Sequence, residues 1–196
     1  YTIAGKRLPV VFHIGARALT SHALNVHAGH DDVMAVADCG WGMLFARTVQ
    51  EAHDLGLIAR RAAEAAATPF FSVQDGFLTT HTIENVRLAE LAMMKEYIGD
   101  PRAYLTSLFD PANPLQTGTV QNQDAYMKGK VAQRQWYDEV PRHLQEAFAE
   151  FGRLTGRHYD FVDGYRLDDA EYAIVGLGTV METARPAIDW LRARFG

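Results

Sequence analysis

The sequence contains a single cysteine, Cys39, among its 196 residues. An internal disulfide is therefore excluded, and so is a cysteine-rich zinc or iron–sulfur site built by this chain alone. No apolar segment approaches the roughly 20 residues that a helix needs to cross a bilayer. From these absences we expect a protein of a reducing compartment, the cytoplasm, without a membrane partner.

The sequence also lacks any block of five or six like charges, and its net charge is −5. Proteins that bind nucleic acid or anionic membranes usually concentrate basic residues, so neither is expected as a partner. Hydrophobic residues make up 48% of the chain and charged residues 22%, which is typical of a folded globular protein.

Apolar, strand-like runs alternate with helix-like segments along the chain. Thr48 and Glu51 have the spacing of a capping box and predict the start of one helix. Such alternation predicts an α/β fold with a parallel sheet flanked by helices. We expect strands or strand-like runs at 8–14, 32–37, 70–73 and 172–178, helices at 19–26, 48–67, 83–97, 142–154 and 179–195, a turn at 40–42 and a long loop at 100–125.

The first of these runs ends in Gly15, Ala16 and Arg17, and the arginine is the leading candidate for a functional residue. Ligands of open α/β sheets collect at the carboxyl ends of strands. A guanidinium matches a carboxylate with two parallel hydrogen bonds. We therefore expect Arg17 to bind a carboxylate, the alternative being a surface arginine after a core strand.

Two further groups of residues are candidates for a substrate or cofactor pocket. The first group contains a thiol beside a glycine, and the second places hydroxyl and imidazole groups between a strand and a helix, where an anion could bind. Plain helix capping and a buried structural cysteine are the alternatives. The two groups are Asp38, Cys39 and Gly40, and Asp75, Thr79 and His81.

Two other patterns carry less information. His13, His22, His27 and His30 lie close together in sequence but lack the spacing of a known metal site, so no metal ligand is expected. Gly176 and Gly178 precede a helix, but Met181 stands where a dinucleotide fingerprint has its third glycine. A tight turn is the preferred interpretation there, and a nucleotide-binding oxidoreductase is the weaker one.

Taken together, short segments in order along the chain resemble the pyruvate:ferredoxin (flavodoxin) oxidoreductases, thiamine-diphosphate enzymes that oxidatively decarboxylate 2-oxoacids. No segment is decisive alone, whereas the set spans most of the sequence. The segments are 8–13 with 16–18, 22–24, Gly40 with 43–44, 49–54, 75–77 with Thr79 and His81, 118–119 with 121–122, and 154–157.

The resemblance implies that residues 1–165 are a pyrimidine-binding domain without its N-terminal part, and that 168–196 begin a transketolase-C-like domain. It implies that Arg17 binds the substrate carboxylate. Thiamine diphosphate, Mg²⁺ and [4Fe-4S] clusters are implied for the parent enzyme, with the metal and cluster ligands outside this chain. The implied partners are the remaining domains or subunits, ferredoxin or flavodoxin, a 2-oxoacid and coenzyme A, in a homodimeric parent enzyme, so this chain alone is expected to be inactive.

The sequence departs from the family pattern at two places. Members commonly carry Arg-Gln-Thr-Gly where this chain has residues 37–40, and an arginine where it has Leu78. Because two basic groups are absent, the identity of the substrate is left open, with pyruvate as the default. It also supports the alternative that the chain is a non-catalytic binding or assembly module that keeps the fold.

Overall fold

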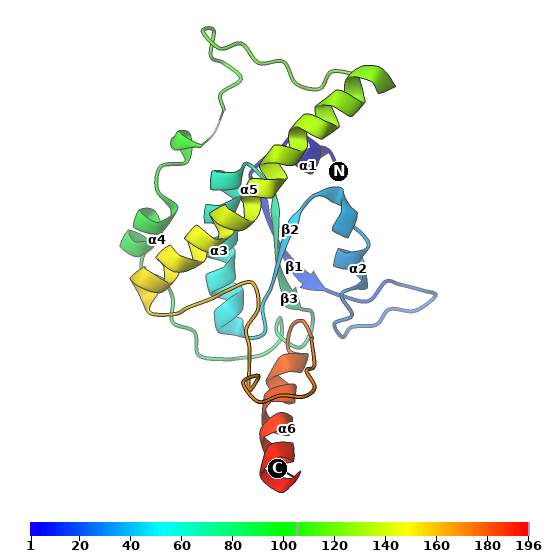
Figure 1. Ribbon diagram of the computed structural model, residues 1–196, viewed down its shortest axis with the longest axis vertical. Coiled ribbons are helices and arrows are strands. Elements are labelled where there is room, and N and C mark those ends of the chain that lie inside the picture. The colour runs from blue at the N-terminus through cyan, green and yellow to red at the C-terminus, as the bar shows by residue number, and fades with distance from the viewer. Residues whose placement is uncertain (105, 196) are drawn as a thin grey trace.

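A three-stranded parallel sheet forms the centre of the computed structural model, which describes residues 1–104 and 106–195 (Figure 1). The strands are β1 (Val11–Ala16), β2 (Gly42–Phe45) and β3 (Phe70–Asp75), in the order β1-β3-β2. Because all three run the same way, their carboxyl ends share one edge of the sheet. The predicted α/β class with a parallel sheet is confirmed.

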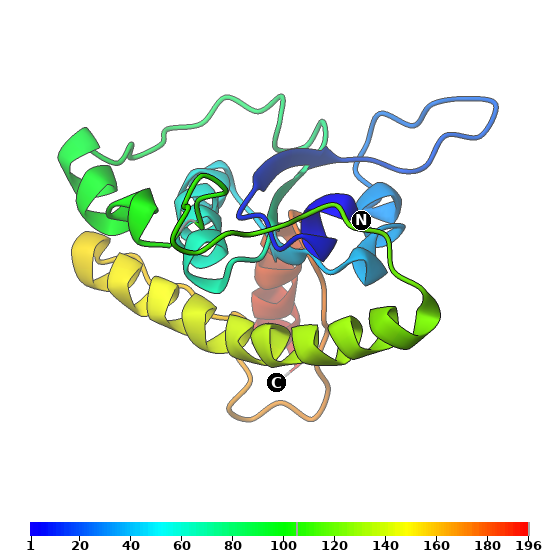
Figure 2. The same cartoon turned by 90° about the horizontal axis from the view of Figure 1, so that it is seen from above.

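Helix α3 (Val49–Ala66) covers one face of the sheet and is itself crossed by α5 (Gln123–Thr155) (Figure 2). The helix begins as its capping sequence predicts, since the Thr48 hydroxyl accepts the Glu51 N–H at 3.2 Å. Alanines on its buried side allow close approach of the neighbouring elements. The main core includes Ile58, Ala59, Ala62, Phe70, Tyr97, Phe148 and Phe151.

The second face of the sheet is only partly covered. Trp41 stacks on Phe71 with ring centroids 4.2 Å apart, and Phe12 packs beside both rings while remaining 43% exposed. The short helix α2 (Asp31–Met34) contributes the buried Val33 to this side. The sheet therefore has one well-covered face and one open, aromatic face.

The prediction of a strand at 32–37 was wrong. This stretch forms α2 and a 3-10 helix (Ala37–Cys39), because Val33 and Val36 are three residues apart and pack on the same side. The strand lies instead at Gly42–Phe45, part of which was expected to be a turn. Position 42 has no room for a side chain, because a Cβ there would overlap the ring of Phe70.

Four other segments differ from expectation. Residues 19–26 form no helix, and residues 83–90 are irregular, so that α4 covers only Leu91–Ile98. Helix α5 begins at Gln123 and continues through Pro141, which has no backbone N–H to donate to the preceding turn. Residues 172–178 form no strand, since no strand within 1–104 and 106–195 pairs with them, and Val175 is 93% exposed.

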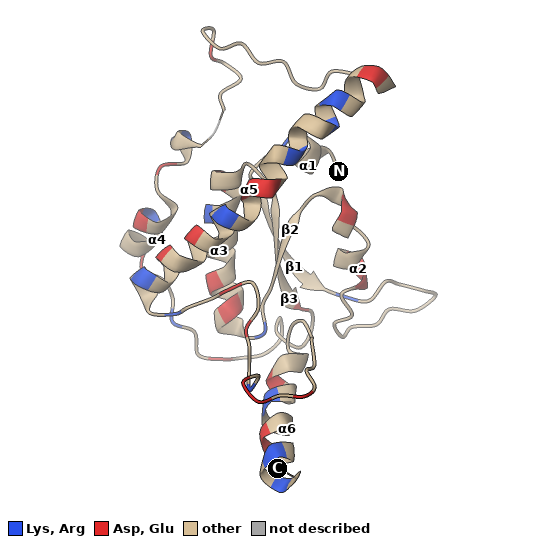
Figure 3. Cartoon of the chain, viewed as in Figure 1, with Lys and Arg blue, Asp and Glu red and all other residues tan. Residues whose placement is uncertain are grey.

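The surface carries both signs of charge on most helices (Figure 3). On α5, Arg142 pairs with Glu139 at 2.8 Å and with Glu146 at 2.7 Å. In the described part of the chain no helix is both long and apolar enough to cross a membrane. The remaining elements are α1 (Thr2–Gly5), a 3-10 helix at Pro101–Ala103 and α6 (Val180–Phe195).

Candidate functional site

The carboxyl edge of the sheet brings Arg17 and Asp75 onto neighbouring strands. Ala16 at the end of β1 is in register with Asp75 at the end of β3, and Arg17 follows directly. The Arg17 N–H donates to Asp32 at 2.9 Å, and the Arg17 side chain lies against Gly76, where any Cβ would overlap it. Its guanidinium forms no hydrogen bond or ion pair with any residue of 1–104 and 106–195, so its donors can bind a carboxylate.

Asp75 is buried, with 4% of its surface exposed, and both of its carboxylate oxygens are used within the protein. Oδ1 lies 2.7 Å from Nε2 of His30, and Oδ2 accepts the N–H of Thr179 at 2.8 Å and its hydroxyl at 2.5 Å. Burial by itself would raise the pKa of this carboxyl, but the hydrogen bonds from Thr179 and His30 outweigh it and hold the pKa below its ordinary value. Asp75 is therefore a charged and fully partnered group.

Thr79 and His81 lie in the turn that follows Asp75. The Thr79 N–H donates to the Asp75 carbonyl at 2.9 Å, while its hydroxyl is buried and has no hydrogen-bond partner among the described residues. His81 is exposed, and its Nδ1 lies 2.8 Å from the hydroxyl of Thr80. The structure thus gathers Arg17, Asp75, Thr79 and His81 at one edge.

Asp38, Cys39 and Gly40 lie elsewhere. They precede β2, so they occupy the amino edge of the parallel sheet, opposite to Arg17. Gly40 has a φ of 87° and approaches the hydroxyl of Tyr137 on α5. This group is therefore separated from Asp75, Thr79 and His81 by the length of the strands.

The sequence reasoning found the segment 49–54 but assigned no role to its polar side chains. Gln50 pairs with both backbone groups of Arg87, accepting its N–H at 2.8 Å and donating to its carbonyl at 3.1 Å. His53 accepts the N–H of Ala89 through Nε2 at 3.1 Å. These two side chains hold the irregular segment 83–90 against α3. The closeness of two polar side chains in an alanine-rich helix was the sequence feature that could have indicated this role.

Asp54, the last residue of that segment, is completely buried and binds groups that follow α5. Arg157 donates to it from Nε at 2.5 Å and from Nη2 at 3.0 Å, and the Tyr159 hydroxyl donates at 2.7 Å. Burial, and then the bond to Asp54, raise the pKa of Tyr159, so it remains a neutral donor. The role of Asp54 is therefore structural.

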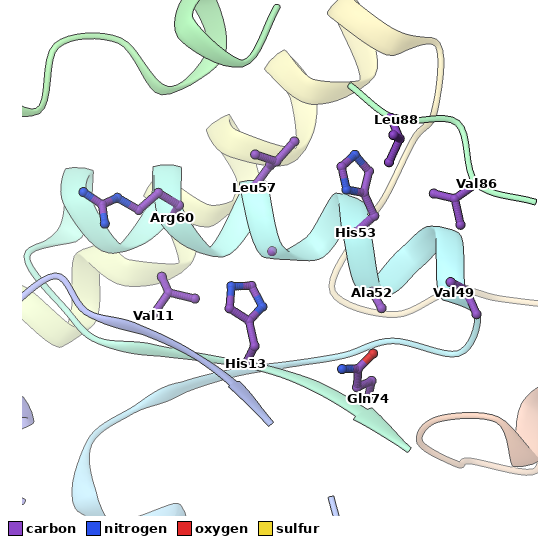
Figure 4. Close-up of a pocket in the computed structure, with 11 residues that line it drawn as sticks. Val11, His13, Val49, Ala52, His53, Leu57, Arg60, Gln74, Val86 and Leu88 are labelled. Carbon is purple, nitrogen blue, oxygen red and sulfur yellow. The ribbon is translucent and has the colours of Figure 1, made fainter. Parts of the chain in front are cut away.

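A groove of about 660 Å³ lies between β1, α3 and the segment 83–90 (Figure 4). His13 points from β1 toward α3, where Gly56 leaves space for its ring, and His53 lines the same groove. Most of the other walls are apolar, among them Val11 and Leu57. This arrangement presents no set of acid and base groups that converge on one point.

The histidines of the N-terminal part are dispersed rather than clustered. His30 contacts Asp75, His13 lines the groove, and nowhere in 1–104 and 106–195 do three His, Cys, Asp or Glu side chains gather closely enough to hold a metal ion. Gly178 has a φ of 74° and stands two residues before α6 begins, in a turn where Met181 donates to its carbonyl at 3.2 Å.

Comparison with known proteins finds relatives over nearly the whole chain. The chain is 37% identical over 193 residues to the pyruvate:ferredoxin oxidoreductase of Moorella thermoacetica, covering 97% of the chain and 16% of that protein. It is 36% identical over 195 residues to the pyruvate-flavodoxin oxidoreductase of Trichormus variabilis, covering 98% of the chain and 16% of that protein. It is 35% identical over 196 residues to the mitochondrial pyruvate dehydrogenase [NADP(+)] of Euglena gracilis, covering 99% of the chain and 11% of that protein.

The chain thus spans a small part of the length of these relatives. Residues 1–149 match the family described as pyruvate flavodoxin/ferredoxin oxidoreductase, thiamine diphosphate-binding. This match covers most of the chain, including the whole sheet and the carboxyl edge that carries Arg17. The chain therefore belongs to the thiamine-diphosphate-binding family of the pyruvate flavodoxin/ferredoxin oxidoreductases.

Proposed function

We propose that the chain is part of an enzyme that oxidatively decarboxylates a 2-oxoacid, with pyruvate as the default substrate, to an acyl-coenzyme A. Electrons would pass one at a time to iron–sulfur clusters and then to ferredoxin or flavodoxin. The names of the relatives carry ferredoxin, flavodoxin and NADP(+), and of these we propose ferredoxin or flavodoxin as the acceptor.

The observation that carries this proposal is the environment of Arg17. Its guanidinium is unpaired within the described residues and stands at the carboxyl edge of a family-matched sheet. A two-pronged guanidinium suits the carboxylate of a 2-oxoacid. The buried hydroxyl of Thr79, in the turn after the neighbouring strand, is a second donor without a partner. We assign Arg17 to carboxylate binding and Thr79 and His81 to the lining of the pocket.

These donors fit the substrate end of a thiamine-diphosphate site. When bound, the cofactor supplies the electron sink for loss of carbon dioxide. We assign the ligands of Mg²⁺ and of the [4Fe-4S] clusters to other parts of a homodimeric, cytoplasmic parent enzyme. Within this chain we assign residues 1–165 to the pyrimidine-binding domain and 168–196 to the start of the next domain.

Native mass spectrometry of the complete protein that carries this chain tests the proposal, followed by denaturation to release small molecules. We expect thiamine diphosphate and iron in a large assembly, together with pyruvate-dependent reduction of a ferredoxin or flavodoxin. A protein that binds no thiamine diphosphate in the presence of Mg²⁺ and reduces no acceptor would contradict it.

The second candidate is a binding or assembly module that has kept the fold without the reaction. It is favoured by Leu78, which is 46% exposed in the turn after β3 and stands where family members commonly carry arginine. An assembly that binds thiamine diphosphate but turns over no 2-oxoacid would support this candidate.

A further inference from the structure

The N-terminus of α6 has a capping sequence whose expected local contacts are replaced by distant ones. Thr179 and Glu182 have the same Thr-x-x-Glu spacing as Thr48 and Glu51 at the start of α3. At α6, however, both the N–H and the hydroxyl of Thr179 donate to Asp75. Glu182 pairs instead with Arg47, which follows β2, at 3.0 Å.

Two residues at the carboxyl edge of the sheet therefore hold this helix. Asp75 ends β3, and its negative charge lies where the helix dipole is positive. Arg47 is mostly buried and also pairs with Glu51 at 2.7 Å and Asp163 at 3.1 Å. The fit around Asp75 is tight, because a Cβ on Gly178 would overlap its carboxylate.

The same contact defines a pocket of about 920 Å³. One wall is formed by His30 and its neighbours Ala28 and Gly29, and the other by Leu177 and the first turn of α6. Asp75 bridges the two walls, with one oxygen on His30 and the other on Thr179. Directly after Asp75, Gly76 lies against the side chain of Arg17.

We infer that Asp75 is a positioning residue that docks the N-terminus of α6 onto the sheet and so sets one wall of this pocket, at the sheet edge that carries Arg17. It does not contact substrate, since both of its oxygens are occupied by His30 and Thr179. This role differs from the pocket-lining role expected from the sequence. Its effect on substrate rests on the proposed function, whereas its effect on α6 does not.

Hydrogen exchange of the complete protein, followed in peptides covering 179–184, tests the inference. We expect Asp75→Ala to accelerate exchange there about fivefold or more, as loss of a cap does. Gly178→Ala should also accelerate exchange, because its Cβ would overlap the Asp75 carboxylate. Asp75→Asn should lose less protection than Asp75→Ala, because an amide oxygen still accepts the Thr179 N–H but no longer places a negative charge at the start of α6. Asp169→Ala is the matched control, since this carboxylate pairs with Arg192 in the last turn of α6 and not with its first turn.

The variants also separate positioning from substrate contact. If Asp75 acts through α6, Asp75→Ala and Gly178→Ala should raise KM for the 2-oxoacid by similar factors, and the double variant should be no worse than either. If these variants fold poorly, Thr179→Val provides a milder perturbation, because it removes the hydroxyl contact with Asp75 and keeps the backbone N–H contact. Unchanged exchange in Asp75→Ala, or an effect on KM that Gly178→Ala does not reproduce, would overturn the inference. Absence of any turnover in the parent protein would instead refute the proposed function and leave the exchange results valid.

Discussion

Asp54 on α3 and Arg157, just after α5, form a two-pronged ion pair across 103 positions of sequence. The carboxylate is completely buried, whereas the guanidinium is partly exposed, and Tyr159 and Gln50 complete the hydrogen bonds of Asp54. This pair holds the segment that follows α5 against α3, the helix that covers the sheet.

Removing the Asp54 carboxylate is expected to destabilise this part of the fold. Asp54→Ala leaves Arg157 and Tyr159 without their buried acceptor, and breaking one side of such a pair typically costs about 3 kcal/mol. Native-state hydrogen exchange in peptides covering α3 and the end of α5 measures the loss. Arg142→Ala, which breaks only exposed pairs on α5, is the control and should change little. Equal effects of the two substitutions would contradict the structural role of Asp54.

A methyl group at Gly42 is expected to disrupt β2. Gly42→Ala places a Cβ against the ring of Phe70, which is 1% exposed and cannot move aside, so overpacking should cost about 2 kcal/mol. Gly5→Ala is the matched control because open space surrounds that position in α1, where alanine is the better helix former. Hydrogen exchange of β2 is the measurement, and unchanged protection in Gly42→Ala would show that the strand tolerates the side chain.

Much of the fold could be predicted from the sequence because its strongest signals are local. The capping sequence at Thr48, the alanines that follow it and the apolar run before Arg17 fixed α3 and β1. The stretch containing Val33 and Val36 was wrongly predicted to be a strand, since short apolar runs fit a strand or a helix equally well. The exposed segment 172–178 looks like a strand, but a strand forms only where another pairs with it.

The candidate site could be predicted only in part. Arg17 and Asp75 follow from the rule that parallel strands end at one edge. Asp38 to Gly40 were misplaced relative to them because the position of β2 was wrong, and they precede that strand instead of following one. Thr179, which donates to Asp75, is 104 positions away along the chain, and nothing in the local sequence indicates such a contact.

Acidification is expected to loosen the start of α6. The pKa of Asp75 is lowered in the folded protein, so its carboxylate contributes stability above the unfolded value of about 3.9, and this contribution is lost as pH falls through the folded value. Exchange of residues 179–184, corrected for its intrinsic pH dependence, should therefore accelerate at low pH. Asp75→Asn should flatten this profile, whereas identical profiles for the two proteins would assign the effect to other carboxylates.

The central claim is that Arg17 binds the carboxylate of a 2-oxoacid, and steady-state kinetics of the complete enzyme test it most directly. Arg17→Lys keeps the positive charge but loses the two-pronged geometry, so KM for pyruvate should rise about tenfold or more, the value of a charge-assisted hydrogen bond. Arg134→Lys on the exposed side of α5 serves as the control. A raised KM in the Arg17 variant alone is the result we predict, and unchanged kinetics in that variant would contradict the assignment.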